Sequence, residues 1–148
     1  MLDLDTAVKQ TIYGVIAETT KAPTSADVAR ALNRTWGEVE AAFQRLCRKR
    51  LLVLEPESRS VILMAPPFSG TETPFLVRVG EKSYYANCVW DALGVAAALH
   101  RDADVIASDA QTGEPMSLRV RDGAPVPETC VIHFAVPAAK WWDDIIHT

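Results

Sequence analysis

Apolar residues recur at helical spacing in the first third of the chain, and they alternate with polar residues in the remainder. The segments Thr24–Asp27 and Thr35–Glu38 each have the pattern of a capping box, so a second and a third helix are predicted to begin there. The apolar stripe that predicts the first helix consists of Val8, Ile12, Val15 and Ile16. The stripe of the third consists of Val39, Ala42, Phe43 and Leu46.

Two short apolar runs, 51–54 and 60–64, follow these helices and flank the polar turn 55–59. Runs of this kind predict a β-hairpin. Three helices followed by a hairpin indicate a winged helix-turn-helix domain over residues 1–65. The proline- and glycine-containing stretch 66–74 is predicted to be a linker.

Residues 75–148 form the second predicted domain, which is a small, mostly antiparallel sheet with one helix. Its predicted helix covers 88–99, and its predicted strands cover 75–79, 83–86, 105–108, 116–120 and 130–136. The whole chain is therefore assigned to the α+β class.

Composition narrows the classes of function. No apolar run approaches the roughly 20 residues that a membrane span needs, and no signal-peptide pattern begins the chain. Three cysteines without paired spacing favour a reducing compartment, so a cytoplasmic location is expected. Residues 65–148 carry 6 basic against 11 acidic residues, which argues against a nucleic-acid surface there.

The distribution of charge in the first domain indicates whether that domain could bind DNA. Four basic residues lie at the end of the predicted third helix, namely Arg45, Arg48, Lys49 and Arg50. The start of that helix, where a recognition helix approaches bases, carries Glu38 and Glu40 instead. The sequence therefore argues against DNA binding. Cys47 is interpreted as a partly buried helix residue.

Cys88 and Asp91 lie three residues apart where a predicted strand gives way to a helix, so both side chains project from one face of its first turn. The positive end of the helix dipole favours the thiolate of Cys88. A structural interpretation stays open, because cysteine is a common core residue and an acid often complements a helix N-terminus.

Three blocks carry a resemblance to a known family. They are Tyr85-Ala86-Asn87-Cys88-Val89-Trp90-Asp91-Ala92-Leu93, Thr112-Gly113-Glu114-Pro115-Met116-Ser117-Leu118, and Val131-Ile132-His133-Phe134-Ala135-Val136-Pro137 with Trp141-Trp142-Asp143-Asp144. The segment 75–142 resembles the catalytic region of the organomercurial (alkylmercury) lyases. The resemblance implies protonolysis of carbon–mercury bonds, with Cys88 as mercury ligand and Asp91 as proton donor. It also implies a helical N-terminal domain that covers the catalytic one.

The family's second catalytic cysteine would fall at or just after position 149, beyond Thr148. One hypothesis is that the next codon is UGA, read as selenocysteine; a UAA or UAG codon there would end the idea. Cys130 is a candidate second mercury ligand if its strand runs beside the Cys88 helix. Otherwise an external thiol would act as co-reactant, with no resident cofactor and with small thiols or a mercuric-ion acceptor protein as partners.

The remaining candidates are interpreted as structural. Asp109 is expected in a turn, His100 at a helix end and His133 in a strand, while Trp141 and Trp142 either cover the site or pack against the sheet. Two alternatives to the lyase stay open. One is a non-catalytic protein that binds a thiophilic metal, and the other is a winged-helix regulator.

Overall fold

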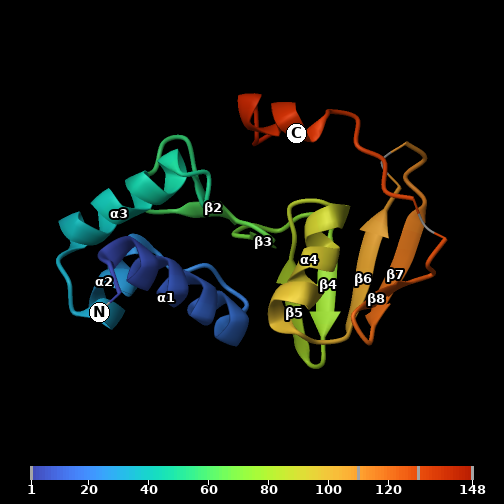
Figure 1. Cartoon of the computed structure of the whole chain (residues 1–148), viewed down its shortest axis with the longest axis horizontal. Helices are drawn as coiled ribbons and strands as arrows, with labels where there is room; N and C mark the ends of the chain where they lie inside the picture. Colours follow the sequence, from blue (N-terminus) through green and yellow to red (C-terminus); the bar gives the residue numbers. More distant parts are fainter. Residues whose placement is uncertain (1, 110, 130, 148) are drawn as a thin grey trace.

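The structure, a computed structural model, describes residues 2–109, 111–129 and 131–147. Three helices come first, α1 (Leu4–Thr19), α2 (Ser25–Leu32) and α3 (Trp36–Arg48) (Figure 1). Both predicted capping boxes are present, because the side chains of Thr24 and Thr35 accept from the backbone N–H groups of Asp27 and Glu38. These caps satisfy N–H groups that the helix starts would leave unpaired. No described helix has the length and apolar character that crossing a membrane requires.

A small antiparallel sheet follows, with the order β1 (Val53–Leu54), β2 (Ile62–Ala65) and β3 (Phe68–Ser69). The predicted hairpin is present, although both of its strands are shorter than or shifted from the predicted runs. The third strand, β3, lies within the stretch predicted to be a linker. Phe68 is only 3% exposed and forms an isolated bridge with Ala86, so β3 joins the small sheet to the start of the second half.

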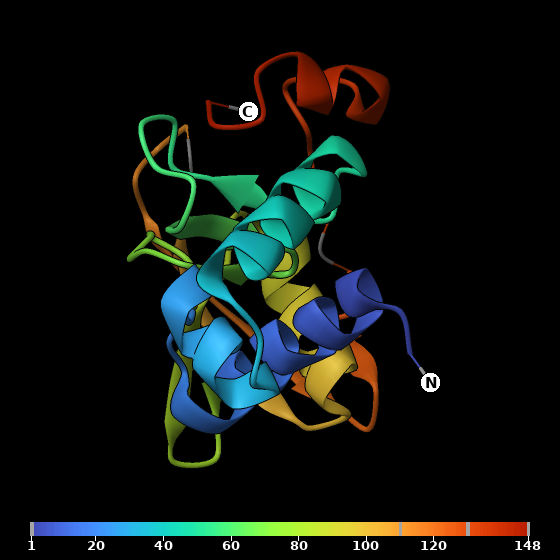
Figure 2. The same ribbon diagram turned by 90° about the vertical axis from the view of Figure 1, so that its left-hand side faces the viewer.

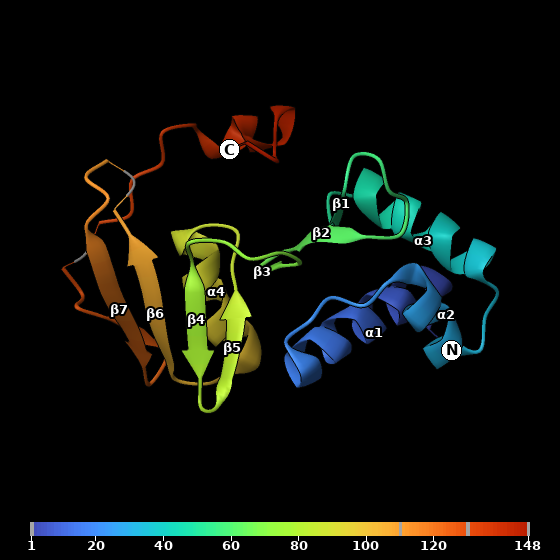
Figure 3. The ribbon, with the colours of Figure 1, turned by 180° about the vertical axis from the view of Figure 1, so that it is seen from behind.

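The second sheet is antiparallel throughout, with the order β5-β4-β6-β7-β8. Its strands are β4 (Leu76–Val79), β5 (Lys82–Tyr85), β6 (Ala103–Ser108), β7 (Pro115–Arg121) and β8 (Ala124–Val126). Helix α4 (Val89–Leu99) packs on one face of β4 and β6 (Figure 3). Side chains of β6 alternate between buried and exposed, as expected for a sheet with one covered face. The predicted α+β class is confirmed.

The strand predicted at 130–136 is wrong. Residues 131–136 form no strand, and Cys130 lies outside the described residues. The position beside β7 is taken by β8, which returns through a tight turn at Asp122 and Gly123. Both turn residues have positive φ, 51° and 78°, the conformation that short hairpin turns require. The 3₁₀ segment η1 (Ala138–Asp143) follows in the C-terminal stretch.

The two halves of the chain share one hydrophobic cluster, which extends from Val8 in α1 to Val120 in β7. Polar contacts also join them, because Tyr84 Oη and Lys82 Nζ both donate to the carbonyl of Ala17, at 2.7 and 3.1 Å. The C-terminal segment returns toward the end of α3 (Figure 2), where Arg50 lies 5.7 Å from the ring centre of Trp142. The helical half therefore packs against both the sheet and the C-terminal segment.

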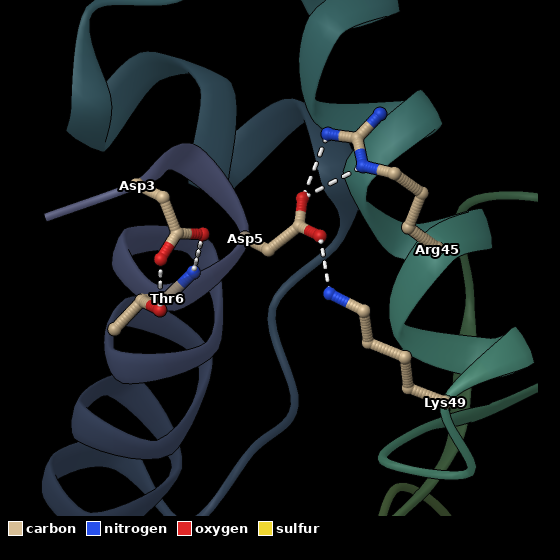
Figure 4. Close-up of polar contacts among 5 residues, drawn as sticks. All are labelled: Asp3, Asp5, Thr6, Arg45 and Lys49. Atoms are coloured by element: carbon tan, nitrogen blue, oxygen red, sulfur yellow. Dashed lines mark hydrogen bonds and ion pairs between the residues drawn. The ribbon is translucent and has the colours of Figure 1, made fainter.

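Asp5 of α1 binds two of the four basic residues at the end of α3 (Figure 4). Its carboxylate accepts from Arg45 at 2.7 Å and from Lys49 at 3.0 Å, and its side chain is only 12% exposed. The hydrogen bond from Arg45 is the largest cause that lowers the pKa of Asp5, with a further contribution from Lys49. Part of the basic cluster thus stabilises the packing of α1 on α3.

Replacing Asp5 by asparagine is expected to lower the free energy of unfolding by about 1 kcal/mol at neutral pH, because the ion pair is only partly shielded from solvent. The folded-state pKa of Asp5 lies below its unfolded value. Its contribution is therefore present above the unfolded pKa and is lost as the pH falls through the folded pKa. Urea unfolding of both proteins at neutral and acid pH measures this difference. If the two proteins differed in free energy of unfolding by the same amount at both pH values, the stabilising ion pair of Asp5 would be contradicted. Arg45→Ala, made in the native protein and in Asp5→Asn, completes a double-mutant cycle as the control.

Candidate active site

Cys88 lies at the junction of β5 and α4, as the sequence predicts. It is the N-cap of α4, with an extended backbone (φ −155°, ψ 179°). Its Sγ accepts a hydrogen bond from the backbone N–H of Asp91 at 3.4 Å, which is the geometry of a capping side chain. The thiol is thereby fixed at the start of the helix, and the carboxylate of Asp91 belongs to the same first turn.

The carboxylate of Asp91 is held by the residue that precedes Cys88. Asn87 Nδ2 donates to Asp91 Oδ2 at 2.9 Å and lies 3.3 Å from the carbonyl oxygen of Phe68, to which it also donates. Asn87 Oδ1 is buried and has no hydrogen-bond partner among the described residues. Strand β3 is thus connected through Asn87 to the predicted proton donor.

Burial dominates the electrostatics of both groups. It raises the pKa of Asp91, against the opposing hydrogen bond from Asn87, so the carboxyl holds a proton to higher pH than an exposed aspartate. Burial also raises the pKa of the Cys88 thiol, and the N–H groups of Asp91 and Trp90 only partly oppose this effect. The pKa of the Cys88 thiol is thus shifted in the direction opposite to the one that a helix N-terminus predicts, because burial is the largest cause.

Tyr13 of α1 contacts the turn and the strand that lie beside Asn87 and Asp91. Its hydroxyl donates to the carbonyl of Pro66 at 2.8 Å, and its ring meets that of Phe68 edge-on with centroids 6.2 Å apart. Burial and the charge of Asp91 both raise the pKa of Tyr13. Pro67 lies against α4, since a Cβ added at Gly94 would be 3.0 Å from Pro67 Cβ. The turn between β2 and β3 is therefore fixed between α1 and α4.

Three aromatic side chains connect the start of α4 to the C-terminal segment. The rings of Trp90 and Phe134 lie 6.3 Å apart, and those of Phe134 and Trp141 lie 4.9 Å apart. Trp141 Nε1 donates to the carbonyl of Val136 at 2.8 Å. Trp141 therefore packs on Phe134 within the C-terminal segment, and a role in covering the site stays a prediction. Trp142 instead packs near Arg50 of the helical half.

Four other residues were considered in the sequence: Asp109, His100, His133 and Cys47. Asp109 accepts from the N–H groups of Gln111 and Thr112, and His100 is the C-cap of α4, so both predicted structural roles are confirmed. His133 is exposed and belongs to no strand, contrary to prediction. Cys47 is half-buried in α3 and lines a hollow shared with Trp142 and Ile145. Across 2–109, 111–129 and 131–147, no three His, Cys, Asp or Glu side chains gather into a metal cluster.

Three residues of the site were not predicted from the sequence: Tyr13, Phe68 and Asn87. Asn87 directly precedes the cysteine, and a short polar residue beside a helix start is a local signal that could have identified it. Phe68 and Tyr13 act through contacts between distant segments, for which a single sequence has no comparable signal.

Comparison with known proteins assigns the family. The family described as MerB, alkylmercury lyase, matches residues 68–148, which is more than half of the chain. The chain belongs to the alkylmercury lyase family. The matched segment contains Cys88 and Asp91, and it begins at Phe68, whose carbonyl binds Asn87.

The fold agrees with this alkylmercury lyase assignment. The crystal structure of the mercury-bound form of MerB2 superposes with a TM-score of 0.66 and 23% sequence identity. The match covers 84% of this chain and 59% of that one, so this chain spans little more than half the length of that relative. The comparison with curated proteins gives no significant match.

Proposed function

We propose that this chain cleaves the carbon–mercury bond of organomercurial compounds by protonolysis. The observation that carries the proposal is the placement of a thiol and a largely buried carboxyl in the first turn of one helix, within the segment that the alkylmercury lyase family matches. The products are a hydrocarbon and mercury(II).

Capture is assigned to Cys88. Mercury(II) is a soft metal that prefers sulfur, so an organomercurial R–Hg–X exchanges X for the sulfur of Cys88. The thiol gives up its proton in this exchange and X leaves with its electron pair. Although burial raises the pKa of the free thiol, metal coordination favours the deprotonated form.

Cleavage is assigned to Asp91. A second sulfur donor adds to mercury and weakens its bond to carbon, and an external thiol supplies this donor in the proposal. The carbon keeps the electron pair of the broken bond and takes the proton of Asp91, which becomes a carboxylate. Because burial raises the pKa of Asp91, a larger fraction of this group is protonated than for an exposed aspartate. The proposal requires no resident cofactor.

The helical half is proposed to be a winged helix-turn-helix that covers the site rather than a DNA-binding unit. Arg45 and Lys49 are engaged by Asp5, and Glu38 closes the capping box at the start of α3. These contacts leave fewer free cations for phosphates than the sequence suggests. Small thiols or a mercuric-ion acceptor would receive the product, in a reducing compartment such as the cytoplasm, as part of mercury detoxification.

The test is release of hydrocarbon from an organomercurial by the purified chain in excess small-molecule thiol, followed by gas chromatography. The native chain is expected to release one hydrocarbon for each mercury bound and to continue through repeated turnovers. Cys88→Ser is expected to lose release by at least about a hundredfold, because a hydroxyl is a poor ligand for mercury. Cys47→Ser is the matched control and retains release. A native chain that binds mercury but releases no hydrocarbon would contradict the lyase proposal.

A further inference from the structure

We propose that Asn87 is a positioning residue for the proton donor: its side-chain amide fixes which oxygen of Asp91 carries the transferable proton. This inference rests on the proposed lyase function and adds a role for a residue that lies beside the catalytic pair. It is carried by the hydrogen bonds of the amide and by the burial of its oxygen.

The orientation of the Asn87 amide is determined by its surroundings. Its nitrogen lies within hydrogen-bond distance of two acceptors, Asp91 Oδ2 at 2.9 Å and the carbonyl of Phe68 at 3.3 Å. A primary amide has two N–H groups, so both are used. Rotating the amide by half a turn would place Oδ1 against these two oxygens. The unpaired, buried Oδ1 is therefore the consequence of an orientation fixed by its nitrogen.

This orientation distinguishes the two oxygens of Asp91. Oδ2 accepts from Asn87, so a proton on the carboxyl group is expected on Oδ1. When that proton moves to carbon, the electron pair of the O–H bond stays on Asp91. The carboxylate then already has an N–H donor, and a hydrogen bond to a charged oxygen is stronger than one to a neutral oxygen. Asn87 thus interacts more favourably with Asp91 after proton transfer than before it.

No other side chain takes this role among the described residues. Two titratable groups face Asp91, Cys88 from the same helix turn and Tyr13 from α1. The Tyr13 hydroxyl donates to Pro66, and Cys88 Sγ accepts from the backbone of Asp91 rather than donating to its carboxylate. Asn87 is the described side chain that donates to the carboxylate.

The anchor of the amide lies in β3. The carbonyl of Phe68 belongs to a strand paired with β2, and the carbonyl of Pro66, two residues earlier, is bound by Tyr13. The position of Asp91 therefore depends on a strand whose place is set by the helical half of the chain.

The experiment separates capture of mercury from release of hydrocarbon. Native protein and Asn87→Ala are loaded with an arylmercury salt, mercury per chain is measured, and hydrocarbon release after thiol addition is followed in a single turnover. The variant is expected to bind the same amount of mercury and to release hydrocarbon about tenfold to a hundredfold more slowly, since a misplaced reacting group costs this much. Asn87→Leu, which keeps the number and branching of the side-chain heavy atoms, repeats the measurement if the alanine variant fails to fold.

Thr73→Val is the matched control. It removes the Thr73 hydroxyl, which donates to the Ala86 carbonyl at 2.6 Å and accepts from the Phe75 N–H at 3.2 Å, and it leaves the hydrogen bond from Asn87 to Asp91 in place. It is expected to capture and release as the native chain does. Native-like release by Asn87→Ala, or equal slowing by Thr73→Val, would overturn the inference. Absence of release from the native chain itself would instead count against the lyase function and remove the role of Asn87 with it.

Discussion

Asp91→Asn is expected to retain mercury capture and to lose hydrocarbon release by roughly a hundredfold to ten-thousandfold, the usual contribution of a general acid. Asparagine matches the size of aspartate, and its carbonyl oxygen can still accept from Asn87. Capture is preserved because Cys88 Sγ is bound by the backbone N–H of position 91, which the substitution does not change. Mercury content and hydrocarbon released in a single turnover measure the two steps separately.

The rate of hydrocarbon release by the native chain is expected to depend on pH through the same carboxyl group. Release requires the protonated carboxyl, so it is expected to slow as the pH rises through the raised pKa of Asp91. Cys47→Ser, a change in the helical half, serves as control and should follow the native profile. Native-like release by Asp91→Asn would mean that the proton comes from another group, and the assignment of Asp91 would then be wrong.

Gly70→Ala is expected to destabilise the fold by about 3 kcal/mol or more, a large loss for a single substitution. A Cβ at this position would lie 1.9 Å from the backbone oxygen of Ile62 and 3.3 Å from that of Leu63. Neither oxygen can move easily, because Ile62 is paired with Leu54 and the carbonyl of Leu63 accepts from the N–H of Gly70 at 2.8 Å. Urea unfolding measures the loss.

Gly14→Ala is the matched control. Gly14 lies within α1, and an added Cβ there meets nothing within 4 Å. Since alanine favours a helix over glycine by roughly 1 kcal/mol, this variant should be slightly more stable than the native chain. If Gly70→Ala unfolded at the same urea concentration as the native chain, the close approach of Gly70 to β2 would be contradicted.

Local signals predicted much of the fold. The two capping boxes depend on residues three apart, and the N-cap position of Cys88 depends on the change from strand to helix patterning, so each was visible in a short window. The strand predicted at 130–136 failed because alternation alone does not supply a pairing partner. Val131 is 90% exposed, and Phe134 packs on Trp90 and Trp141 instead. The Asp122-Gly123 turn was the local signal for the strand that pairs with β7.

The candidate site was predicted only in part, for a physical reason. Cys88 and Asp91 belong to one helix turn, so their proximity follows from spacing. The direction of the Cys88 pKa shift depends on burial by segments far along the chain, and spacing carries no information about that. Tyr13 precedes Pro66 by 53 residues in the sequence, and only the folded chain brings the two into contact.

The hydrogen bonds to the carbonyl of Ala17 determine where this chain can be divided into fragments. This carbonyl lies in the last turn of α1, where a helix leaves carbonyl groups without partners of their own, and it is bound by Tyr84 and Lys82 of β5. A fragment that starts at residue 68 would leave the Tyr84 hydroxyl without its acceptor, and the complementary fragment would lose the cap on its first helix. Expression and domain-exchange experiments should therefore keep α1 and β5 on the same polypeptide.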